Sequence, residues 1–327
     1  MGEDKCERLD PVTVKQAAEE LNETSKTRKN ALKELRHWLK AQRHLQNVRT
    51  DHSFLVRFLR FQKFNLESTK TVFDKYIHMR QHHSEWFQNL DIQEPKMRDI
   101  MSSGYLIVLP ERDANGRRVI FSRACSVDVS KFTACDIMRA HILTYEALLT
   151  DEETQVKGIT YVFDERNINL SHISIWSPSD ISKAFSCCEK AMPIRHQEIH
   201  FVHLPWTMSL VFAFGKSLLS KKLSERFQTH SNFEKLSKEF DSSILPEGYG
   251  GTVSLEDMTN SWIQELEDCR EEILDLDRMK YGLKKGSEAK RKTSVNSAQK
   301  KNKPENSGIL NMVKSVRKME NRTSESA

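Results

Sequence analysis

The segment from Trp206 to Leu219 constrains the fold more than any other part of this chain. Its sequence, WTMSLVFAFGKSLL, places apolar side chains on every side of a helix, and Lys221, Lys222 and Arg226 follow directly. A helix that is apolar all round is buried in protein or in lipid. About 14 residues are too few to cross a bilayer, which takes roughly 20. The segment is therefore either a core helix or a lid over an apolar cavity. Such a lid can be pressed into a membrane surface, with the following cations placed to meet anionic headgroups.

Positive charge is concentrated in the C-terminal tail. The formal net charge is +5, but residues 280–327 hold thirteen Lys or Arg against four Glu, so residues 1–279 carry about −4. Attraction to nucleic acid or acidic lipid therefore comes from the tail and from local patches. The tail lacks the interleaved aromatic side chains on which single-stranded nucleic acids stack, so we expect no nucleic-acid partner. Its lysine clusters leave a localisation signal open as an alternative.

The cysteines indicate a reducing compartment. The six cysteines form no C-x-x-C pair and no disulfide-framework spacing, and no signal peptide precedes them. We expect each to be a small buried side chain in a cytoplasmic protein. No apolar run is long enough to span a bilayer, so any membrane contact is expected to be peripheral.

Helical patterns dominate the first 94 residues. One helix is predicted over residues 11–45, where leucines recur among dense charges and no Gly or Pro follows Pro11. Asp51 and Ser53 can cap a second helix, and Asn65 opens a third that reaches toward Met79. We therefore predict an N-terminal helical domain over residues 1–94.

After Pro95 the pattern becomes typical of an α/β domain. Strands are predicted at 105–109 and 119–122, on either side of the turn sequence at 113–116, and again at 158–165 and 199–204. Helices are predicted at 133–149, at 177–191 and from Pro205 onward. Alternation of this kind implies right-handed crossovers and a mostly parallel sheet. We predict that this domain occupies residues 95–254.

Two further segments complete the chain. Residues 255–283 are predicted to form an acidic helix, and residues 284–327 a basic tail with too few large apolar residues to order itself. Within that tail, Ile309, Met312, Val313, Val316 and Met319 recur at helical spacing beside lysine and arginine. This short amphipathic segment either touches a membrane or belongs to a solvated tail.

Sequence motifs for catalysis and metal binding are absent. There is no G-x-S-x-G, P-loop, G-x-G-x-x-G, H-E-x-x-H or EF-hand sequence, and the Gly250-Gly251 pair is interpreted as tight backbone geometry. His196, His200 and His203 suggest a metal cluster, but positions 200 and 203 of a strand point to opposite faces, so we expect no metal or other cofactor. Asp164 and Glu165 end a strand without a recognisable base or nucleophile. We predict that the protein is not an enzyme.

Several motifs resemble the CRAL-TRIO family of lipid-binding proteins. They are Ser53–Phe64, Gly116–Val119, the strand GITYVFD, Pro193–Arg195, the segment from Ile199 to Arg226, and Leu245-Pro246 with Tyr249–Gly251. They occur in the family's order over roughly residues 28–280, and are similar to the branch of the alpha-tocopherol transfer protein, cellular retinaldehyde-binding protein and clavesins. The resemblance implies an N-terminal helical unit followed by an α/β domain, with a mostly parallel sheet, flanking helices and a mobile gate helix over an apolar cavity.

The resemblance also implies a function. It implies an intracellular carrier of one small hydrophobic molecule, tocopherol-, retinoid- or phospholipid-like, that exchanges this cargo at phosphoinositide-containing membranes. We expect a cytoplasmic monomer that associates peripherally with endosomal or other intracellular membranes. Two alternatives are a non-transferring phosphoinositide-dependent signalling or scaffold module, and a lipid-modifying enzyme that depends on a residue such as Asp164.

Matching positions suggest which residues form the cavity and its gate. The gate corresponds to Trp206, Leu210, Val211, Phe212, Phe214 and Leu218. The cavity corresponds to Ser122, Met138, His141, Tyr145, Ile159, Phe163, Trp176, Ala184, Cys187, Cys188 and Ile194, each of which could also be ordinary core. Ser122, His141 and Tyr145 depart from the residues of the tocopherol carrier, so tocopherol cannot be assumed as the cargo. Buried His141 and Tyr145 need partners, either a polar group of the cargo or another side chain.

The resemblance places a phosphoinositide site beside the gate. Its candidate cations are Arg57, Lys63, Arg195, Lys222 and Arg226. Gln62 and Gln197 stand at two positions that belong to the basic patch of the tocopherol carrier, which leaves the headgroup affinity and selectivity open. Arg57 and Arg60 could equally be structural ion-pair partners.

Overall fold

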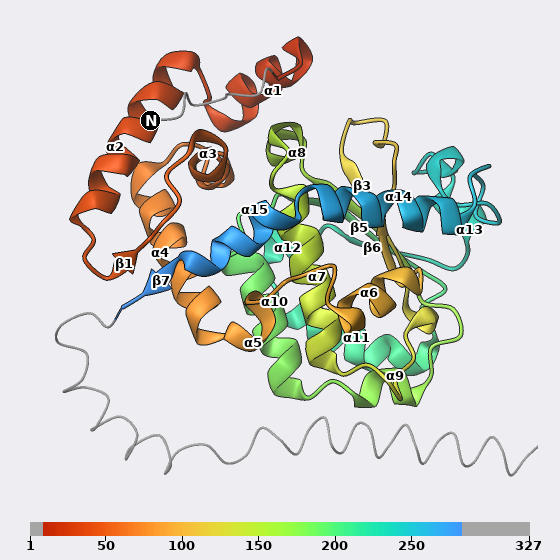
Figure 1. Ribbon diagram of the computed structural model, residues 1–327. Coiled ribbons are helices and arrows are strands. Elements are labelled where there is room, and N and C mark those ends of the chain that lie inside the picture. Colours follow the sequence, from red (N-terminus) through yellow and green to blue (C-terminus); the bar gives the residue numbers. More distant parts are fainter. Residues whose placement is uncertain (1–8, 283–327) are drawn as a thin grey trace, which may run out of the picture.

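A five-stranded sheet forms the centre of the protein (Figure 1). The computed structural model describes residues 9–282, apart from the side chains of residues 207 and 209–211. The strands are β2 (Leu106–Val108), β3 (Arg118–Arg123), β4 (Ile159–Asp164), β5 (His196–Val202) and β6 (Phe227–His230), and they lie in that order across the sheet. β2 pairs antiparallel with β3, and the remaining neighbours are parallel. The predicted mostly parallel α/β sheet is confirmed.

The edge strand β6 was not predicted. Its four residues, Phe227–His230, include only one large apolar side chain, so no apolar run indicates a strand. Parallel pairing with β5 holds this segment in the sheet, from Ile199 paired with Phe227 to Val202 paired with His230. Two short strands, β1 (Leu45–Gln46) and β7 (Lys280–Tyr281), form a separate antiparallel pair.

The N-terminal unit contains four longer helices and one short one. These are α1 (Pro11–Leu21), α2 (Ser25–Ala41), α3 (His52–Phe61), α4 (Leu66–His82) and α5 (Ser84–Phe87). Asp51 and Asn65 cap α3 and α4 as predicted, because each side chain accepts a hydrogen bond from a backbone N–H of the first turn. The predicted single helix over 11–45 is wrong. It breaks where Asn22 adopts a left-handed φ of 63° and Thr24 caps a new helix.

Helices cover both faces and one edge of the sheet. The helices of the α/β domain are α6 (Pro95–Ser102), α7 (Ala134–Leu148), α8 (Glu152–Lys157), α9 (Leu170–Ser174), α10 (Pro178–Lys190), α11 (Ser209–Ser217), α12 (Lys221–Ser224) and α13 (Phe233–Leu236). Short 3-10 turns lie at Ala124–Ser126, Trp206–Met208 and Ser242–Ile244. α9, α10 and α11 gather on one side of the sheet (Figure 1), whereas α13 packs against β5 and β6 on the other. None of the helices in the described range is long and apolar enough to span a bilayer.

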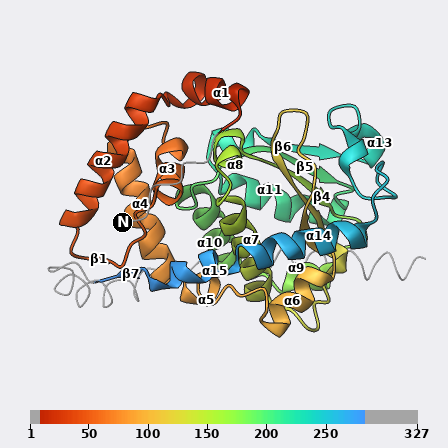
Figure 2. The same ribbon diagram turned by 45° about the horizontal axis from the view of Figure 1, so that its top comes forward.

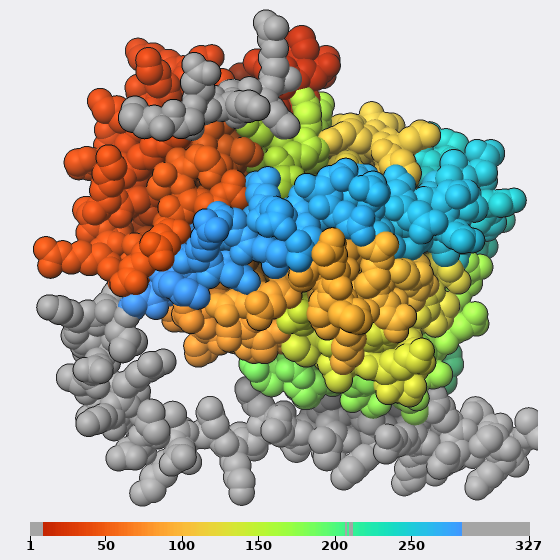
Figure 3. Space-filling model, viewed as in Figure 1, coloured from red at the N-terminus to blue at the C-terminus, as the bar shows by residue number. Residues whose placement is uncertain are grey.

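The C-terminal helices form a strap across the molecule. α14 (Leu255–Asp268) packs against edge strand β2 and α6, and α15 (Arg270–Asp275) and a 3-10 turn (Leu276–Arg278) continue toward β7. The space-filling view shows this segment as a continuous band beside the N-terminal unit (Figure 3). The acidic helix predicted over 255–283 is therefore interrupted, at Cys269. The basic tail at 284–327, with its amphipathic segment, lies outside the described residues, as does Cys6.

Buried ion pairs join the N-terminal unit to the α/β domain. The Glu146 carboxylate on α7 accepts hydrogen bonds from Arg57 (3.2 Å), Arg80 (3.1 Å) and the Tyr76 hydroxyl (2.7 Å). α1 lies beside α8 (Figure 2), and the Asp10 amide donates to Glu153 at 2.6 Å. The two parts of the chain therefore have a shared, charged interior.

The glycine pair near the end of the α/β domain has the predicted backbone role. Gly250 has a φ of 123°, which L side chains rarely adopt, and a Cβ on Gly251 would lie 1.6 Å from the Leu245 carbonyl oxygen. Both positions therefore require glycine for the turn that leads into α14.

Candidate functional site

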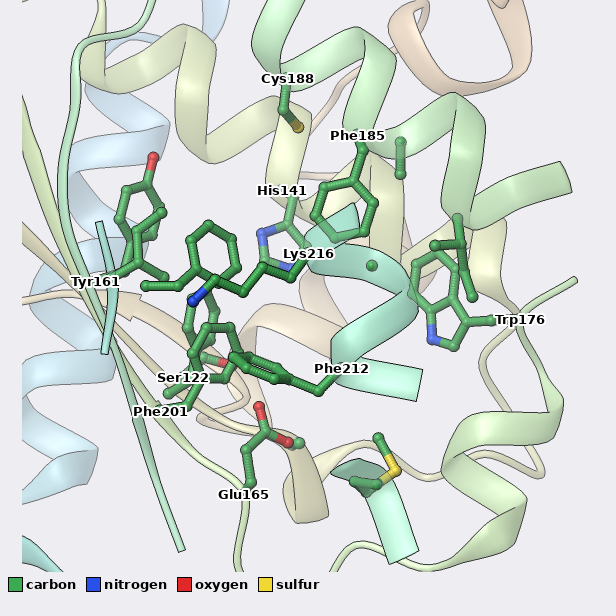
Figure 4. A pocket seen from close by; sticks show the side chains of 18 of the residues that line it. Ser122, His141, Tyr161, Glu165, Trp176, Phe185, Cys188, Phe201, Phe212 and Lys216 are labelled. Atoms are coloured by element: carbon green, nitrogen blue, oxygen red, sulfur yellow. The ribbon is translucent and has the colours of Figure 1, made fainter. Parts of the chain in front are cut away.

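An apolar cavity lies between the sheet and the helices α7, α9, α10 and α11 (Figure 4). Its volume is about 390 Å³, within the range of roughly 300–1,000 Å³ that is typical of small-molecule sites. We call it the ligand cavity. The interior is not filled by side chains, which is what a carrier requires.

Aromatic rings from three strands form the floor of the ligand cavity. The rings of Phe163 and Phe201 stack with centroids 5.0 Å apart, and those of Phe201 and Phe227 with centroids 5.5 Å apart. Tyr161 lies on the same face as Phe163 and stacks on it at 5.8 Å. Tyr161 and Phe201 were missed as lining residues, although alternation along the predicted strands could have identified both. Phe227 belongs to the strand that gave no signal.

Eight of the eleven residues predicted for the cavity line it. They are Ser122, Met138, His141, Tyr145, Phe163, Trp176, Ala184 and Cys188. The structure brings them together around one space, and their contact with a ligand stays a prediction.

The other three predicted cavity residues lie elsewhere. Ile159 begins β4 and is 1% exposed in the core, whereas the cavity extends along the later part of that strand. Cys187 is equally buried and points away from its neighbour Cys188, because successive helical residues are about 100° apart. Ile194 lies before β5 and lines a neighbouring groove instead.

The helix α11 closes the ligand cavity on one side. Phe212 lines the cavity, and its ring centroid lies 4.9 Å from that of Phe201. Lys216 and Leu219 also line it, whereas Phe214 and Leu218 are half-buried and do not. A Cβ on Gly215 would lie 3.1 Å from the ring of Phe185 on α10, so α11 approaches α10 closely.

Two gate predictions need separate mention. Trp206 is 66% exposed, just before the helix that closes the cavity. The side chains of Leu210 and Val211 lie outside the described part of the structure. The apolar segment thus covers a cavity, and its movement stays a prediction.

The histidines and tyrosines around the cavity pair with one another. The Tyr105 hydroxyl lies 2.8 Å from Nε2 of His141, and the Tyr161 hydroxyl lies 2.7 Å from Nδ1 of His196. Burial lowers the pKa of both histidines to about 4, so both imidazoles are neutral near pH 7. His141 therefore has a side-chain partner. Burial also raises the pKa of Tyr145 well above its ordinary value.

A second hollow, the cationic groove, adjoins the ligand cavity. Its volume is about 650 Å³, and four of the five predicted headgroup cations line it: Lys63, Arg195, Lys222 and Arg226. His196 and Leu223 belong to the walls of both the groove and the cavity. Gln62 and Gln197 line the groove as well, and Arg226 donates to Oε1 of Gln197 at 3.4 Å.

The cations of the groove repel one another. Burial, followed by the charges of Arg226, Lys63 and Arg195, lowers the pKa of Lys222. Burial and the charges of Arg195 and Arg117 likewise lower the pKa of Arg226. An anion in the groove would relieve this repulsion, because opposite charge favours the protonated form of each cation.

Two acidic side chains already enter the groove. Oε2 of Glu20 on α1 lies 2.6 Å from Nη2 of Arg195, whose other terminal nitrogen donates to the Val156 carbonyl. Glu189 on α10 accepts from the Ser220 amide at 3.0 Å. Of these two, only Glu20 forms an ion pair with a groove cation within the described residues.

Arg57 does not belong to the groove, which corrects its prediction as a headgroup ligand. Its side chain is 4% exposed and donates hydrogen bonds to the Glu146 carboxylate and the Tyr76 hydroxyl. Arg60 is fully buried and pairs with Glu23 at 2.8 Å and Glu152 at 3.0 Å. Both arginines are structural ion-pair partners.

The polar residues that suggested chemistry have structural partners. Arg166 and the Tyr249 hydroxyl donate to Asp164, at 2.7 Å and 3.1 Å. His200 lies 3.0 Å from His230 on the face of the sheet opposite Phe201. Within residues 9–282, no group of three His, Cys, Asp or Glu side chains is arranged to hold a metal ion.

The fold and the cavity together define a protein with an apolar cavity between a mostly parallel sheet and a helical cover. Residues 102–251 match the family model described as CRAL/TRIO domain, and residues 24–97 match one described as Pinta-like, UBA domain. Clavesin-1 of Xenopus laevis is 30% identical over 259 residues, which cover 79% of this chain and 78% of the relative. Clavesin-2 of Homo sapiens is 30% identical over 261 residues, 80% of each chain. The chain therefore belongs to the CRAL-TRIO family of lipid-binding proteins, in its clavesin-like branch.

Among solved structures, the crystal structure of Sfh5 matches with a TM-score of 0.49 and 14% identity. The match covers 77% of this chain and 92% of that chain.

Proposed function

We propose that this protein is an intracellular carrier that encloses one small hydrophobic molecule and exchanges it at phosphoinositide-containing membranes. The observation that carries the proposal is the position of α11. This helix closes the ligand cavity, and the cationic groove adjoins the same cavity through the shared residues His196 and Leu223. A headgroup held in the groove therefore lies beside the cover through which the cargo leaves.

The cavity must be closed during transit and opened at a membrane. Removing apolar surface from water contributes roughly 0.8 kcal/mol per CH₂, so a chain of a dozen carbons gains on the order of 10 kcal/mol. The same free energy makes release into water very slow. Release therefore requires a second apolar phase at the opening, which a bilayer supplies.

The residues around α11 are suited to transient docking. Trp206 is already exposed, and its insertion contributes at most about 1.5–3 kcal/mol. Each cation near an anionic leaflet adds about 1 kcal/mol. These contributions support reversible attachment of a monomeric, cytoplasmic protein to endosomal or other intracellular membranes.

A vesicle-to-vesicle transfer assay tests this proposal. Mass spectrometry first identifies the lipids in an organic extract of the native protein. The purified full chain is then loaded with these lipids. Transfer to acceptor vesicles is then measured with and without phosphoinositide. We expect faster transfer to phosphoinositide vesicles, with vesicle binding that weakens as salt rises, since charges are screened within about 8 Å at physiological ionic strength.

Adjacent lysines provide a matched control. Lys222 lines the groove, whereas Lys221 is 90% exposed and faces Glu225. We expect Lys222→Gln to weaken vesicle binding about fivefold, corresponding to about 1 kcal/mol, and Lys221→Gln to have a smaller effect. Equal losses would contradict a headgroup site in the groove. Vesicle binding without any lipid movement would favour a signalling or scaffold module.

A further inference from the structure

Glu165 places a carboxyl group in the wall of the ligand cavity. It directly follows β4, and its backbone amide donates to the Val202 carbonyl at 2.9 Å. Because side chains alternate along an extended chain, Asp164 points to the other side, toward Arg166 and Tyr249. Figure 4 shows the Glu165 carboxyl turned toward the ring of Phe212 and the interior of the cavity.

No described residue donates a hydrogen bond to this carboxyl group, and on His141, whose Nε2 is paired, the Nδ1 atom is buried without a partner. Tyr105 and His141 are paired with each other, and Tyr161 with His196. Burial and the charge of Asp164 raise the pKa of Glu165 to about 7. Glu165 is half-buried. A polar group that is withdrawn from water without a partner is costly, so an unmatched one in a ligand site points to a ligand that supplies the partner.

Other titratable groups surround Glu165. Tyr105 lies near enough that burial and the Glu165 charge both raise its pKa. His172 of α9 and Lys216 of α11 also line the cavity, and Lys216 reaches across it from the covering helix (Figure 4). No ion pair joins Lys216 to Glu165 across the described cavity walls. The cavity thus combines one acidic group, one cation and otherwise mostly apolar or mutually paired side chains.

We infer that Glu165 anchors the polar end of the cargo by accepting a hydrogen bond from a hydroxyl group, so that the cargo is a lipophilic alcohol. This inference rests on the proposed carrier function and names its cargo class. A hydroxyl group carries no charge and can donate to Glu165 while it accepts from a donor such as Lys216.

Charged cargo heads fit the cavity less well than a hydroxyl. A fatty acid would bring a second carboxyl group close to Glu165, and two neighbouring carboxylates cannot both ionise without strong repulsion. A lipophilic amine would bring a second cation into an apolar cavity that already contains Lys216. The neutral alcohol avoids both costs.

The test compares four ligands that share one C18 chain: oleyl alcohol, its methyl ether, oleic acid and oleylamine. Each displaces a fluorescent apolar probe from the purified full chain near pH 7. We expect the alcohol to bind about tenfold or more tightly than the ether, which lacks the donor, and more tightly than the acid and the amine.

Two variants and a control assign this preference to Glu165. Glu165→Leu should abolish the advantage of the alcohol over the ether while the ether still binds, and Glu165→Gln should retain part of it through its amide oxygen. Glu67→Leu, at a side chain that is 83% exposed, should change nothing. Retained binding of the ether also shows that the variant is folded.

Three results would overturn the inference. The first is equal binding of alcohol and ether by the unmodified protein, the second is tighter binding of the acid or the amine, and the third is an alcohol preference that persists in Glu165→Leu. In each of these the carrier function stands, because apolar ligands still bind. If none of the four ligands displaces the probe, the carrier function fails and the inference fails with it.

Discussion

Glu20 competes with a membrane headgroup for the cationic groove, and its replacement is predicted to strengthen vesicle binding. Burial raises the pKa of this carboxyl, but the hydrogen bond and charge of Arg195 outweigh burial and hold the pKa below its usual range. Glu20 is therefore ionised near pH 7. A phosphate that binds Arg195 must displace it, and Glu20→Gln removes that competition.

The structure sets the size of this effect. The side chains of Arg195 and Glu20 are 15% and 44% exposed, so the pair is screened by solvent. Ion pairs of this kind contribute about 0.2–1 kcal/mol, which corresponds to an affinity gain of about 1.4-fold to fivefold. The gain should shrink as ionic strength rises.

The neighbouring residue Glu19 provides the control. It lies on the same helix and is 66% exposed, and its partner is Lys15 at 3.9 Å rather than a groove cation. Glu19→Gln changes the net charge by the same amount as Glu20→Gln. Sedimentation with phosphoinositide vesicles over a range of ionic strength measures both variants. If the two bind equally tightly, Glu20 is not a competitor and the reasoning is refuted.

Three further predictions concern stability and docking. The pKa of Glu165 rises from 4.5 to about 7 on folding, so its contribution to stability is full below about pH 4.5 and is lost as pH rises through 7. Between about pH 5 and pH 8, the free energy of unfolding of the unmodified protein should fall by up to about 3 kcal/mol relative to that of Glu165→Gln. If urea titrations show the same difference between the two proteins at every pH, the pKa shift is contradicted. Glu146→Leu leaves the buried Arg57 and Arg80 without their shared counter-charge. It should lower the free energy of unfolding, measured with urea, by about 3–5 kcal/mol. A loss below about 1 kcal/mol would show that the network is dispensable. Trp206→Ala should weaken vesicle binding without changing the salt dependence or the free energy of unfolding, because the ring is exposed; unchanged binding would remove Trp206 from the docking surface.

Local signals in the sequence were enough to locate most of the longer elements of the fold, whereas most of the short helices and edge strands gave no such signal. Thr133 and Ser177 begin α7 and α10 as predicted, because each accepts a hydrogen bond from a backbone amide three residues later. The turn at 113–116 connects β2 and β3 as predicted, with the Gly116 amide donating to the Asp113 carbonyl at 2.8 Å. These features depend on a few consecutive residues, so the sequence displays them directly.

Long-range contacts could not be predicted in the same way. The sequence left Arg57 open as either a headgroup cation or an ion-pair partner. Its partner Glu146 is 89 residues away in sequence, and only the fold brings the two together. The same limit explains why Glu165 was seen at the end of a strand but not as part of the cavity wall. Which face of β4 meets the cavity depends on α11, which follows much later in the chain.

The C-terminal strap has a consequence for how the protein is made. Arg80 pairs with Asp277, 197 residues later, and Arg270 forms a bidentate pair with Asp91 at 2.6 Å. The ribosome therefore releases nearly the whole described chain before Arg80 on α4 and Asp91 in the loop after α5 meet these partners. A nascent chain that stalls before α14 leaves edge strand β2 uncovered, and unpaired strand edges are where incomplete chains stick to one another. Newly made copies should thus depend on chaperones until synthesis has passed Tyr281.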